Sequence, residues 1–340
     1  MHNIIATLRE RGLLQDFTDS SIEDHVSKKN ITVYIGFDPT SDSLHVGHLV
    51  SVLVLKHFQM HGHKPIAVAG GATGMVGDPS GRSEERNLLS PEQLEKNLQG
   101  IRENLRHFLH FEGENAAVVV NNADWIAPFS FLDFLRVVGK HFRIGDMLAK
   151  DSVKRRLESE AGLSYTEFSY QLLQAYDFLH LYKEFDCTVQ AGGSDQWGNI
   201  TAGTELIRRT EGGQVFGITT PLLTNAEGQK MGKTASGAVW LNKEKLSPYE
   251  FYQYWIRVDD RDVEKFLRML TIMPLEDIAG VMQQHMAAPD QRTAQRRLAW
   301  EMTSMVHGEE EAQRAREASE ALFGGKIEKK TDAELKEIFN

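Results

Sequence analysis

The sequence has few of the features that mark secreted, membrane-spanning or zinc-binding proteins. It contains one cysteine, Cys187, in 340 residues, which excludes an internal disulfide framework and indicates a reducing compartment. The shortage of thiolates also argues against a structural zinc site. Arg9, Glu10 and Arg11 interrupt the N-terminal apolar residues and argue against a secretory signal. The most apolar run, residues 49–55, is too short to cross a bilayer, which needs about 20 residues. We therefore expect a cytoplasmic protein without membrane attachment.

Basic residues are also fewer than acidic residues over the whole chain. There are 38 basic against 48 acidic residues, a net charge of −10. Such a balance argues against a protein held on nucleic acid by its overall field. Local basic clusters keep RNA binding open, although each such cluster is more often simply a solvated helix face. The clusters are Lys150, Lys154, Arg155 and Arg156; Arg208 and Arg209; Arg292, Arg296 and Arg297.

The chain is long enough for two domains. Residues 31 to about 223 alternate short β-branched runs with amphipathic helical stretches, which predicts an α/β domain with a mainly parallel sheet. From about Ser247 onward helical patterns dominate, so we expect a separate α-helical domain. In an α/β sheet, ligands bind beyond the carboxyl ends of the strands. The candidate strands are residues 31–36, 65–69, 116–121 and 188–191.

The segment YIGFDPTSDSLHVGH, residues 34–48, predicts a strand, a proline turn and a helix that opens on two histidines. Ser43 is a candidate N-cap for that helix. A helix N-terminus attracts anions, His45 and His48 share one helical face, and Gly47 lets a flat ring approach the backbone. The combination suits a nucleotide. A capped amphipathic helix with solvent-facing histidines is an equally weighted alternative.

A glycine-rich segment, GGATGMVGDPSGR, begins at Gly70 and follows the second strand. It does not match the dinucleotide fingerprint G-x-G-x-x-G, which argues against a nicotinamide enzyme. Asp78 is a candidate partner for a substrate ammonium, and Arg82 and Arg86 for phosphate oxygens. A tight turn with solvent-facing charges explains the segment equally well.

The segment EGQKMGKT, residues 227–234, resembles a phosphate-binding P-loop only superficially. Gly228 and Gly232 have three residues between them where a P-loop requires four, so that assignment fails. The loop still presents Lys230 and Lys233, whose ammonium groups suit a polyphosphate. Taken alone, the segment is by default a plain exposed loop.

One further helix carries a polar stripe. Tyr170, Gln174 and Asp177 are spaced i, i+4 and i+7 and therefore project from one helical face. They offer a phenol, an amide and a carboxylate to a pocket. Such a stripe is more often simply the solvated side of a helix.

Taken together, these segments resemble the bacterial-type tyrosyl-tRNA synthetases, which are class I aminoacyl-tRNA synthetases. The resemblance runs through YIGFDPT, HVGH (the HIGH motif), GGATGMVGDPSG, FSYQLLQAYDF, GGSDQWGNI and KMGKT (the KMSKS motif), and it covers nearly the whole chain. It implies a Rossmann-like catalytic domain over residues 1–223, with a dimerisation insertion at about 125–160. It further implies a KMSKS-type loop and linker (224–246), an α-helical anticodon-binding domain (247–323) and a linker stub (324–340).

The resemblance implies a two-step reaction. ATP and L-tyrosine form tyrosyl-adenylate and pyrophosphate, and the tyrosyl group then passes to the 3′ end of tRNA(Tyr). The substrate carboxylate is the nucleophile, so catalysis rests on positioning and on charge stabilisation. Mg²⁺ would arrive with ATP, with no protein-built metal site and no tightly bound cofactor. The enzyme would be a homodimer.

The resemblance also assigns roles residue by residue. The tyrosine-binding positions would be Tyr34 and Asp177 at the phenolic hydroxyl, Asp78, Tyr170 and Gln174 at the α-ammonium, and Gln196 at the carboxylate. The ATP-binding positions would be Gly36, Asp38, His45, Gly47, His48, Gly193, Asp195, Lys230, Met231 and Lys233. The catalytic positions would be Thr40, His45, His48, Arg82, Arg86, Lys230, Lys233 and Thr234.

The chain departs from the family pattern in two places. It ends at Asn340, where family members usually continue into a small RNA-binding domain, so we expect a truncated or naturally short form that keeps adenylate formation and whose tRNA affinity is in question. Gly232 replaces the first serine of KMSKS, a change that we expect to be neutral.

Three rival functions remain to be weighed. A tryptophanyl relative is disfavoured because an indole has no hydroxyl for Tyr34 and Asp177 to recognise. A catalytically inactive RNA-binding scaffold is disfavoured because it would not need the HVGH histidines or the lysines of KMGKT. A nicotinamide oxidoreductase lacks its glycine fingerprint.

Overall fold

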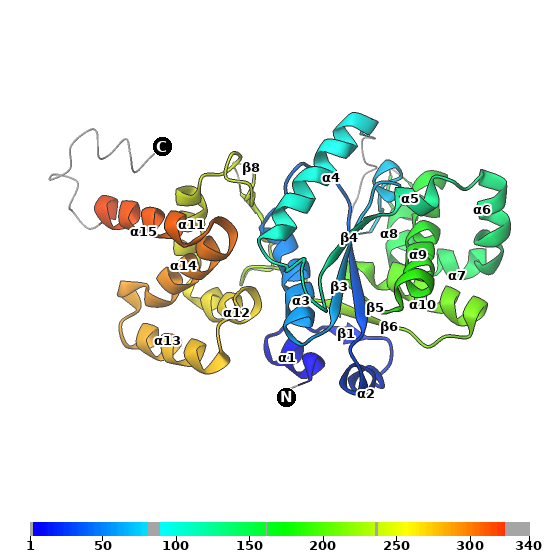
Figure 1. Ribbon diagram of the computed structural model, residues 1–340. Coiled ribbons are helices and arrows are strands. Elements are labelled where there is room, and N and C mark those ends of the chain that lie inside the picture. The colour runs from blue at the N-terminus through cyan, green and yellow to red at the C-terminus, as the bar shows by residue number, and fades with distance from the viewer. Residues whose placement is uncertain (1–2, 81–88, 161, 235–236, 324–340) are drawn as a thin grey trace. The chain divides into compact units, whose positions relative to one another are not determined.

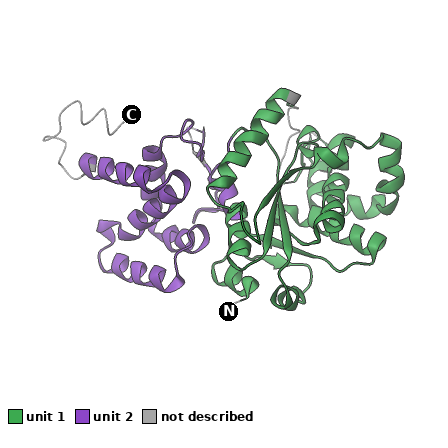
Figure 2. Ribbon diagram, in the orientation of Figure 1, with its two compact units in different colours: residues 1–42, 51–222 green, residues 43–50, 223–340 purple. Residues whose placement is uncertain are grey.

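The computed structural model describes residues 3–80, 89–160, 162–234 and 237–323 (Figure 1). By its internal contacts the chain divides into two compact units (Figure 2): unit 1 is residues 1–42 and 51–222, and unit 2 is residues 43–50 and 223–340. The predicted fold class, a mainly parallel α/β region followed by a helical region, is confirmed. Residues 43–50, which contain HVGH, group with unit 2, and the linear sequence pattern gives no sign of this.

Unit 1 is built on one sheet with the strand order β1-β6-β5-β2-β3-β4. Neighbouring strands are parallel except β1, which pairs antiparallel with β6. The strands are β1 Asp16–Phe17, β2 Thr32–Phe37, β3 Lys64–Ala69, β4 Val118–Asn121, β5 Cys187–Gly193 and β6 Phe216–Thr220. The four predicted strands correspond to β2, β3, β4 and β5. The sequence missed β1, which has two residues, and β6, whose apolar run is interrupted by Gly217.

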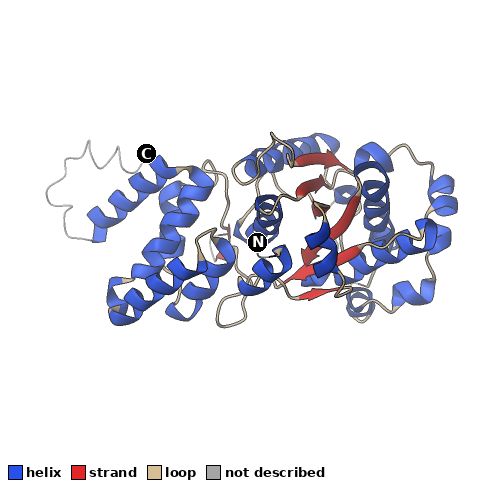
Figure 3. Ribbon diagram, turned by 60° about the horizontal axis from the view of Figure 1, so that its bottom comes forward, coloured by secondary structure: helices blue, strands red, loops and turns tan. Residues whose placement is uncertain are grey.

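Helices lie on both faces of this sheet, with α3 and α4 on one side and α9 and α10 on the other (Figures 1 and 3). The helices of the α/β region are α1 Ile4–Glu10, α2 Ile22–Lys28, α3 Leu49–Met60, α4 Pro91–Arg106, α5 Ala123–Ile126, α6 Phe131–Val137, α7 Ile144–Leu148, α8 Asp151–Leu157, α9 Tyr165–Phe185 and α10 Trp197–Glu211. The apolar side of α9 packs on the sheet: Phe178 and Leu181 join Ile66 and Val68 of β3 in one buried cluster. This burial fixes which face of α9 points toward the strand ends.

The start of α9 is held by a buried ion pair. Arg156 of α8 donates to both carboxylate oxygens of Glu167, at 2.8 and 2.7 Å, and both side chains are 2% exposed. Arg156 also donates to the carbonyl of Gly162 at 2.9 Å. Ser164 caps the helix by accepting from the Glu167 amide at 3.2 Å. The helix that carries the predicted substrate residues therefore has a fixed origin.

Unit 2 is mainly helical. Its helices are α11 Pro248–Ile256, α12 Asp260–Leu270, α13 Leu275–Ala287, α14 Thr293–His307 and α15 Glu309–Phe323, and a small ribbon pairs β7 Lys233–Thr234 with β8 Gly237–Ala238. Its core contains Trp255 and Phe251 of α11, Phe266 of α12, and Leu298 and Met302 of α14. Aromatic and aliphatic side chains at helical spacing thus close this unit without a sheet.

No helix in the described ranges is both long and apolar enough to span a bilayer. Across the same residues, no three His, Cys, Asp or Glu side chains gather into a metal-binding group. The linker stub predicted at 324–340 lies outside the described residues.

Candidate active site

The strand order of unit 1 reverses between β2 and β5. From β2 the chain proceeds outward to β3 and β4, and from β5 it proceeds outward to β6 on the other side. Such a switch point leaves a crevice at the carboxyl ends of the two strands. β2 ends at Phe37 and β5 at Gly193, so the side chains that follow, Asp38, Asp195 and Gln196, belong to this edge. All three are half-buried.

Tyr34 lies in β2 beside this edge, opposite Gln190 of β5 in the sheet register. Its ring is 1% exposed and lies 5.4 Å from the ring of Phe178. Within the described part of the chain, neither Tyr34 Oη nor Gln190 Oε1 has a hydrogen-bond partner. Burial raises the pKa of Tyr34 well above its usual value, with the charge of Asp177 as the next cause. The phenol is therefore neutral, and its hydrogen-bonding capacity is unused.

Asp177 of α9 is 3% exposed and held at both carboxylate oxygens. Oδ1 accepts from Nε1 of Trp125 at 2.8 Å, and Oδ2 accepts from Nδ2 of Asn122 at 3.0 Å. Burial raises the pKa of Asp177 to about 7, and the two donors partly offset this by favouring the carboxylate. A carboxylate offers about four acceptor positions. The group is thus fixed in orientation and able to accept a further donor.

The sequence prediction missed Asn122 and Trp125. Both follow β4, in the segment NNADW, and therefore stand at the same edge of the sheet as the predicted residues. Asn122 also donates to Oγ1 of Thr73 at 3.0 Å and accepts from the Ala72 amide at 2.8 Å. The sequence does show an amide and an indole N–H shortly after a strand. Nothing in the neighbouring sequence indicates that these two side chains face Asp177.

Tyr170 and Asp38 meet at a second point of the cluster. Tyr170 Oη donates to Oδ2 of Asp38 at 3.1 Å, and Thr73 Oγ1 donates to Oδ1 at 2.9 Å. Gly70 makes this possible, since a Cβ there would lie 2.4 Å from Asp38 Oδ1. Gln174, one turn along α9 from Tyr170, is half-buried. The polar stripe predicted on α9 is therefore turned largely inward, and the solvated-face alternative is wrong for Tyr170 and Asp177.

Asp78 and Gln196 form a third contact. Gln196 Nε2 donates to Oδ2 of Asp78 at 2.7 Å, and Asn199 lies within 3.4 Å of Oδ1. The amide of Ser80 donates to Oδ1 at 2.9 Å, which closes the turn after the glycine-rich segment. Asp78 is buried, so the solvent-facing alternative is wrong for this carboxylate.

The remaining predicted positions are less tightly enclosed or are not described. Gly36 and Thr40 are exposed, and Gly193 is half-buried. Arg82 and Arg86 lie outside the described residues. The backbone of Lys233 and Thr234 forms β7, whereas their side chains are not part of the described structure.

In unit 2, HVGH folds as a 3₁₀ turn, η1 Val46–His48, in which the histidines bond to the backbone. Nδ1 of His45 accepts from the Gly47 amide at 3.0 Å, and Nδ1 of His48 accepts from the His45 amide at 3.2 Å. The rings lie 4.1 Å apart between centroids. Because each Nδ1 is an acceptor, the neutral rings carry their proton on Nε2. The turn thus orients two imidazole N–H donors.

The prediction that Ser43 caps this helix is wrong. The cap is His45, and the Ser43 hydroxyl instead donates to the Leu44 carbonyl at 2.8 Å and accepts from the Asn242 amide at 3.2 Å. The helix opens with a 3₁₀ turn after Leu44, too far along the chain for Ser43 to reach its free amides.

The loop KMGKT is in backbone contact with HVGH inside unit 2. Gly232 has φ +98°, and a Cβ there would lie 2.7 Å from the Gly47 amide nitrogen. The Gly232 carbonyl accepts from the Val239 amide at 3.0 Å. Both the dihedral and the close approach require glycine in this conformation. We expect glycine to be neutral here as a replacement for the serine of the motif. Replacing Gly232 by a residue with a side chain, in contrast, is not neutral in this conformation.

The basic clusters identified from the sequence have structural as well as surface roles. Arg156 is in the buried pair with Glu167, and Arg292 donates to the carbonyls of Ile256 and Val258 at 2.7 and 2.9 Å. Arg208 and Arg209 pair with Glu205 on the surface of α10. The solvated-face alternative is thus wrong for Arg156 and Arg292.

The family model described as "tRNA synthetases class I (W and Y)" matches residues 26–324. The chain belongs to this family. The Tyrosine–tRNA ligase of Rhodopirellula baltica is 56% identical to this synthetase over 339 residues, covering 99% of the chain and 77% of the relative. Tyrosine–tRNA ligase 1 of Bacillus subtilis is 52% identical over 340 residues, covering 99% of the chain and 80% of the relative.

Solved structures agree with this assignment. A C-terminally truncated mitochondrial tyrosyl-tRNA synthetase from Aspergillus nidulans superposes on the synthetase with a TM-score of 0.86 at 32% identity, covering 95% of each chain. A tryptophanyl-tRNA synthetase from Plasmodium falciparum reaches a TM-score of 0.64 at 12% identity, covering 98% of the synthetase and 88% of that chain. At that identity, the likeness shows the fold alone.

Proposed function

We propose that this synthetase is a tyrosine–tRNA ligase whose choice of amino acid rests on the buried side chains of Tyr34 and Asp177. It activates L-tyrosine with ATP to tyrosyl-adenylate and pyrophosphate, and then transfers tyrosine to the 3′ end of tRNA(Tyr). The carrying observation is that a fully buried phenol without a partner lies near a buried, oriented carboxylate. Leaving such groups unsatisfied is costly, so the arrangement anticipates a polar ligand atom.

The substrate hydroxyl supplies the missing hydrogen bonds. In this proposal it donates to the Asp177 carboxylate and accepts from Tyr34 Oη. With phenylalanine bound, Tyr34 Oη would be enclosed without a partner, and Asp177 would keep only its bonds to Trp125 and Asn122. An unsatisfied buried group costs roughly 1–3 kcal/mol, and more when it is charged. The family is an established example of rejecting phenylalanine without an editing step.

The other end of the amino acid faces opposite charge and amide groups. The α-ammonium would bind Asp78, Tyr170 and Gln174, while Gln196 would orient the carboxylate. The Gln196–Asp78 hydrogen bond of 2.7 Å supports this division because it joins the ammonium-binding and carboxylate-binding groups. A positioned carboxylate is what the first step requires, since that carboxylate attacks the α-phosphorus and no enzyme nucleophile is needed.

The residues proposed to bind ATP offer hydrogen-bond donors and stretches of backbone that the nucleotide can approach closely. The imidazole N–H groups of His45 and His48 and the lysines of KMGKT would neutralise charge that develops on the polyphosphate. Gly47 would admit the nucleoside, and Asp195 would bind its ribose. Mg²⁺ would enter with ATP as part of the substrate. The further ATP and catalytic positions are Gly36, Asp38, Thr40, Arg82, Arg86, Gly193, Met231 and Thr234.

A homodimer is proposed from the insertion at about 125–160. Its helices α6 and α7 expose large apolar side chains, namely Phe131, Leu132, Val137, Ile144 and Leu148. Exposed apolar side chains gathered on one short segment favour an interaction site. The insertion would therefore pair with its copy in a second chain.

The anticodon-binding role proposed for residues 247–323 is supported by a basic cavity of about 1100 Å³ in unit 2. Arg257, Arg296 and Arg297 line it, and Arg316 lies 4.9 Å over the Trp300 ring. Guanidinium groups beside a half-buried aromatic ring suit an unpaired nucleotide of RNA.

The proposed reaction, the charging of tRNA with tyrosine, belongs where translation takes place. We therefore propose a cytoplasmic enzyme.

The test is pyrophosphate exchange into ATP, run separately with each amino acid. We expect exchange with L-tyrosine and background rates with tryptophan and phenylalanine. Equal exchange with tryptophan, or none with tyrosine, would refute the proposed function.

A further inference from the structure

The lysines of KMGKT act only if the loop that carries them is correctly placed. Residues 223–231 form a small hairpin in which the Asn225 amide donates to the Gln229 carbonyl at 2.9 Å and Thr224 pairs with Lys230. Gly228, with φ +78°, turns the chain. The hairpin is a short exposed ribbon, and an isolated ribbon of this size is not stable alone in water. Something outside it must fix its position.

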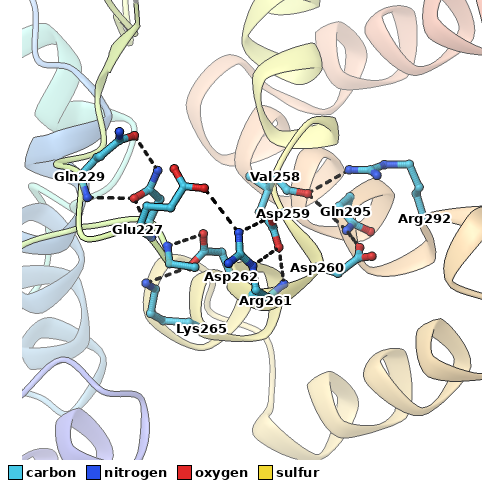
Figure 4. Close-up of polar contacts among 12 residues, drawn as sticks. Glu227, Gln229, Val258, Asp259, Asp260, Arg261, Asp262, Lys265, Arg292 and Gln295 are labelled. Carbon is cyan, nitrogen blue, oxygen red and sulfur yellow. Dashed lines mark hydrogen bonds and ion pairs between the residues drawn. The ribbon is translucent and has the colours of Figure 1, made fainter.

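Two side chains of α12 form hydrogen bonds with the backbone of this hairpin. The amide of Ala226 donates to Oδ2 of Asp262 at 2.8 Å (Figure 4). Lys265 Nζ donates to the Thr224 carbonyl at 2.6 Å. The two side chains also pair with each other, with Lys265 Nζ 3.1 Å from Asp262 Oδ1. The Asp262 side chain is 5% exposed, so its bonds are sheltered from water.

The start of α12 is itself anchored. Arg292, which directly precedes α14, and Gln295 of α14 donate to the Val258 carbonyl, at 2.9 and 3.4 Å. Gln295 also bonds to the carboxylate of Asp260 (Figure 4). On the exposed side, Arg261 lies 3.5 Å from Glu227 of the hairpin. The hairpin is therefore connected through α12 to the core helices of unit 2.

From these contacts we propose that Asp262 and Lys265 are positioning residues that hold the KMGKT loop where its lysines reach the polyphosphate. The proposal rests on the proposed function. Both side chains bond to main-chain groups at the base and turn of the hairpin, so they fix the path of the backbone. The opposite strand of the hairpin leads directly into Lys230, Met231 and Gly232. A shift of about 1 Å in catalytic groups can cost about a hundredfold in rate.

The decisive comparison uses the full chain with Lys265→Met, Asp262→Ala and the conservative variant Lys265→Arg. Glu264→Gln is the matched control, because Glu264 lies on the same helix and pairs with Arg268 at 2.7 Å on its exposed side. The measurements are the rate of adenylate formation in a single turnover, the KM for ATP and the equilibrium Kd for tyrosine. The melting temperature shows that each variant is folded.

We expect Lys265→Met and Asp262→Ala to lower the rate of adenylate formation by about tenfold or more, with the tyrosine Kd within about twofold of wild type. Lys265→Arg, which keeps a cationic donor, should recover much of the rate, and Glu264→Gln should retain all of it. An unchanged rate in a folded Lys265→Met protein overturns the proposal, as does a loss of tyrosine binding that matches the loss of rate. Pyrophosphate exchange by the wild-type protein with tyrosine tests the proposed function separately. A failure of the proposed function can therefore be distinguished from a failure of the positioning role of Asp262 and Lys265.

Discussion

Asp177 lies on α9 with both oxygens bonded, to Trp125 at 2.8 Å and to Asn122 at 3.0 Å, and it is enclosed with the phenol of Tyr34. Each single feature is common in proteins. Their combination is selective because burial makes every unused hydrogen-bonding position expensive. At the scale of residues, specificity for tyrosine thus comes from hydrogen-bonding positions of Tyr34 and Asp177 that stay unused until the substrate hydroxyl binds.

The raised pKa of Asp177 makes tyrosine binding depend on pH. The phenol donates more strongly to the carboxylate than to the protonated acid, so binding favours the charged form and releases a proton. Since the pKa of the free site is about 7, the Kd for tyrosine should increase as the pH falls below about 7. Calorimetry without ATP measures this directly. The Asp177→Asn variant should bind weakly at every pH, and a wild-type Kd that stays constant would contradict the assignment.

At the scale of elements, α9 depends on its anchor and the KMGKT loop depends on glycine. The Arg156–Glu167 pair sits at the start of the helix that carries Tyr170 and Asp177. The loop at Gly232 approaches HVGH so closely that a side chain has no room. The first feature fixes the helix that carries predicted tyrosine-binding residues, and the second fixes the backbone that carries predicted ATP-binding residues.

Breaking the buried pair on one side should be severe. Glu167→Leu leaves the Arg156 guanidinium buried without its carboxylate and should cost about 3–5 kcal/mol in the free energy of unfolding. The double variant Arg156→Met with Glu167→Leu removes both charges and should lose clearly less. Denaturant unfolding of the two proteins measures the difference. A double variant as unstable as the single one would show that packing, and not the stranded charge, is responsible.

Gly228 and Gly232 offer a matched pair for the loop. Both have positive φ, but an added Cβ meets nothing within 4 Å at Gly228, whereas it meets the Gly47 amide at Gly232. An alanine in such a conformation costs roughly 1–2 kcal/mol by strain alone. We expect Gly232→Ala to slow adenylate formation far more than Gly228→Ala, with tyrosine binding unchanged. Equal rates would show that the contact with HVGH is not required.

At the scale of the whole molecule, the sequence predicted the α/β and helical regions, the strands of the switch point and most of the side chains that gather there. Those predictions rest on local periodicity and on residue types after strands. It could not predict that Asn122 and Trp125 hold Asp177, because each contact joins residues more than 50 positions apart. Nor could it show that residues 43–50 belong with unit 2 or that His45 replaces Ser43 as the cap.

The proposed dimer is tested at this scale. Leu132 on α6 is 69% exposed, and a charge there would be buried unpaired in a pairing of two insertions. Leu132→Asp should give a monomer by light scattering while the circular dichroism stays that of the wild type. Met286→Asp, equally exposed on α13, should leave the dimer intact. A dimeric Leu132→Asp protein would place the interface elsewhere.

The central claim is that Tyr34 and Asp177 read one hydroxyl group, and the ratio of kcat/KM for tyrosine to kcat/KM for phenylalanine in pyrophosphate exchange tests it most directly. Tyr34→Phe removes one uncharged hydrogen bond and should lower this ratio by roughly 2–15-fold, while Asp177→Asn should lower it much further. Both changes should act through tyrosine and leave the KM for ATP near its wild-type value. A ratio unchanged in both variants would contradict the account.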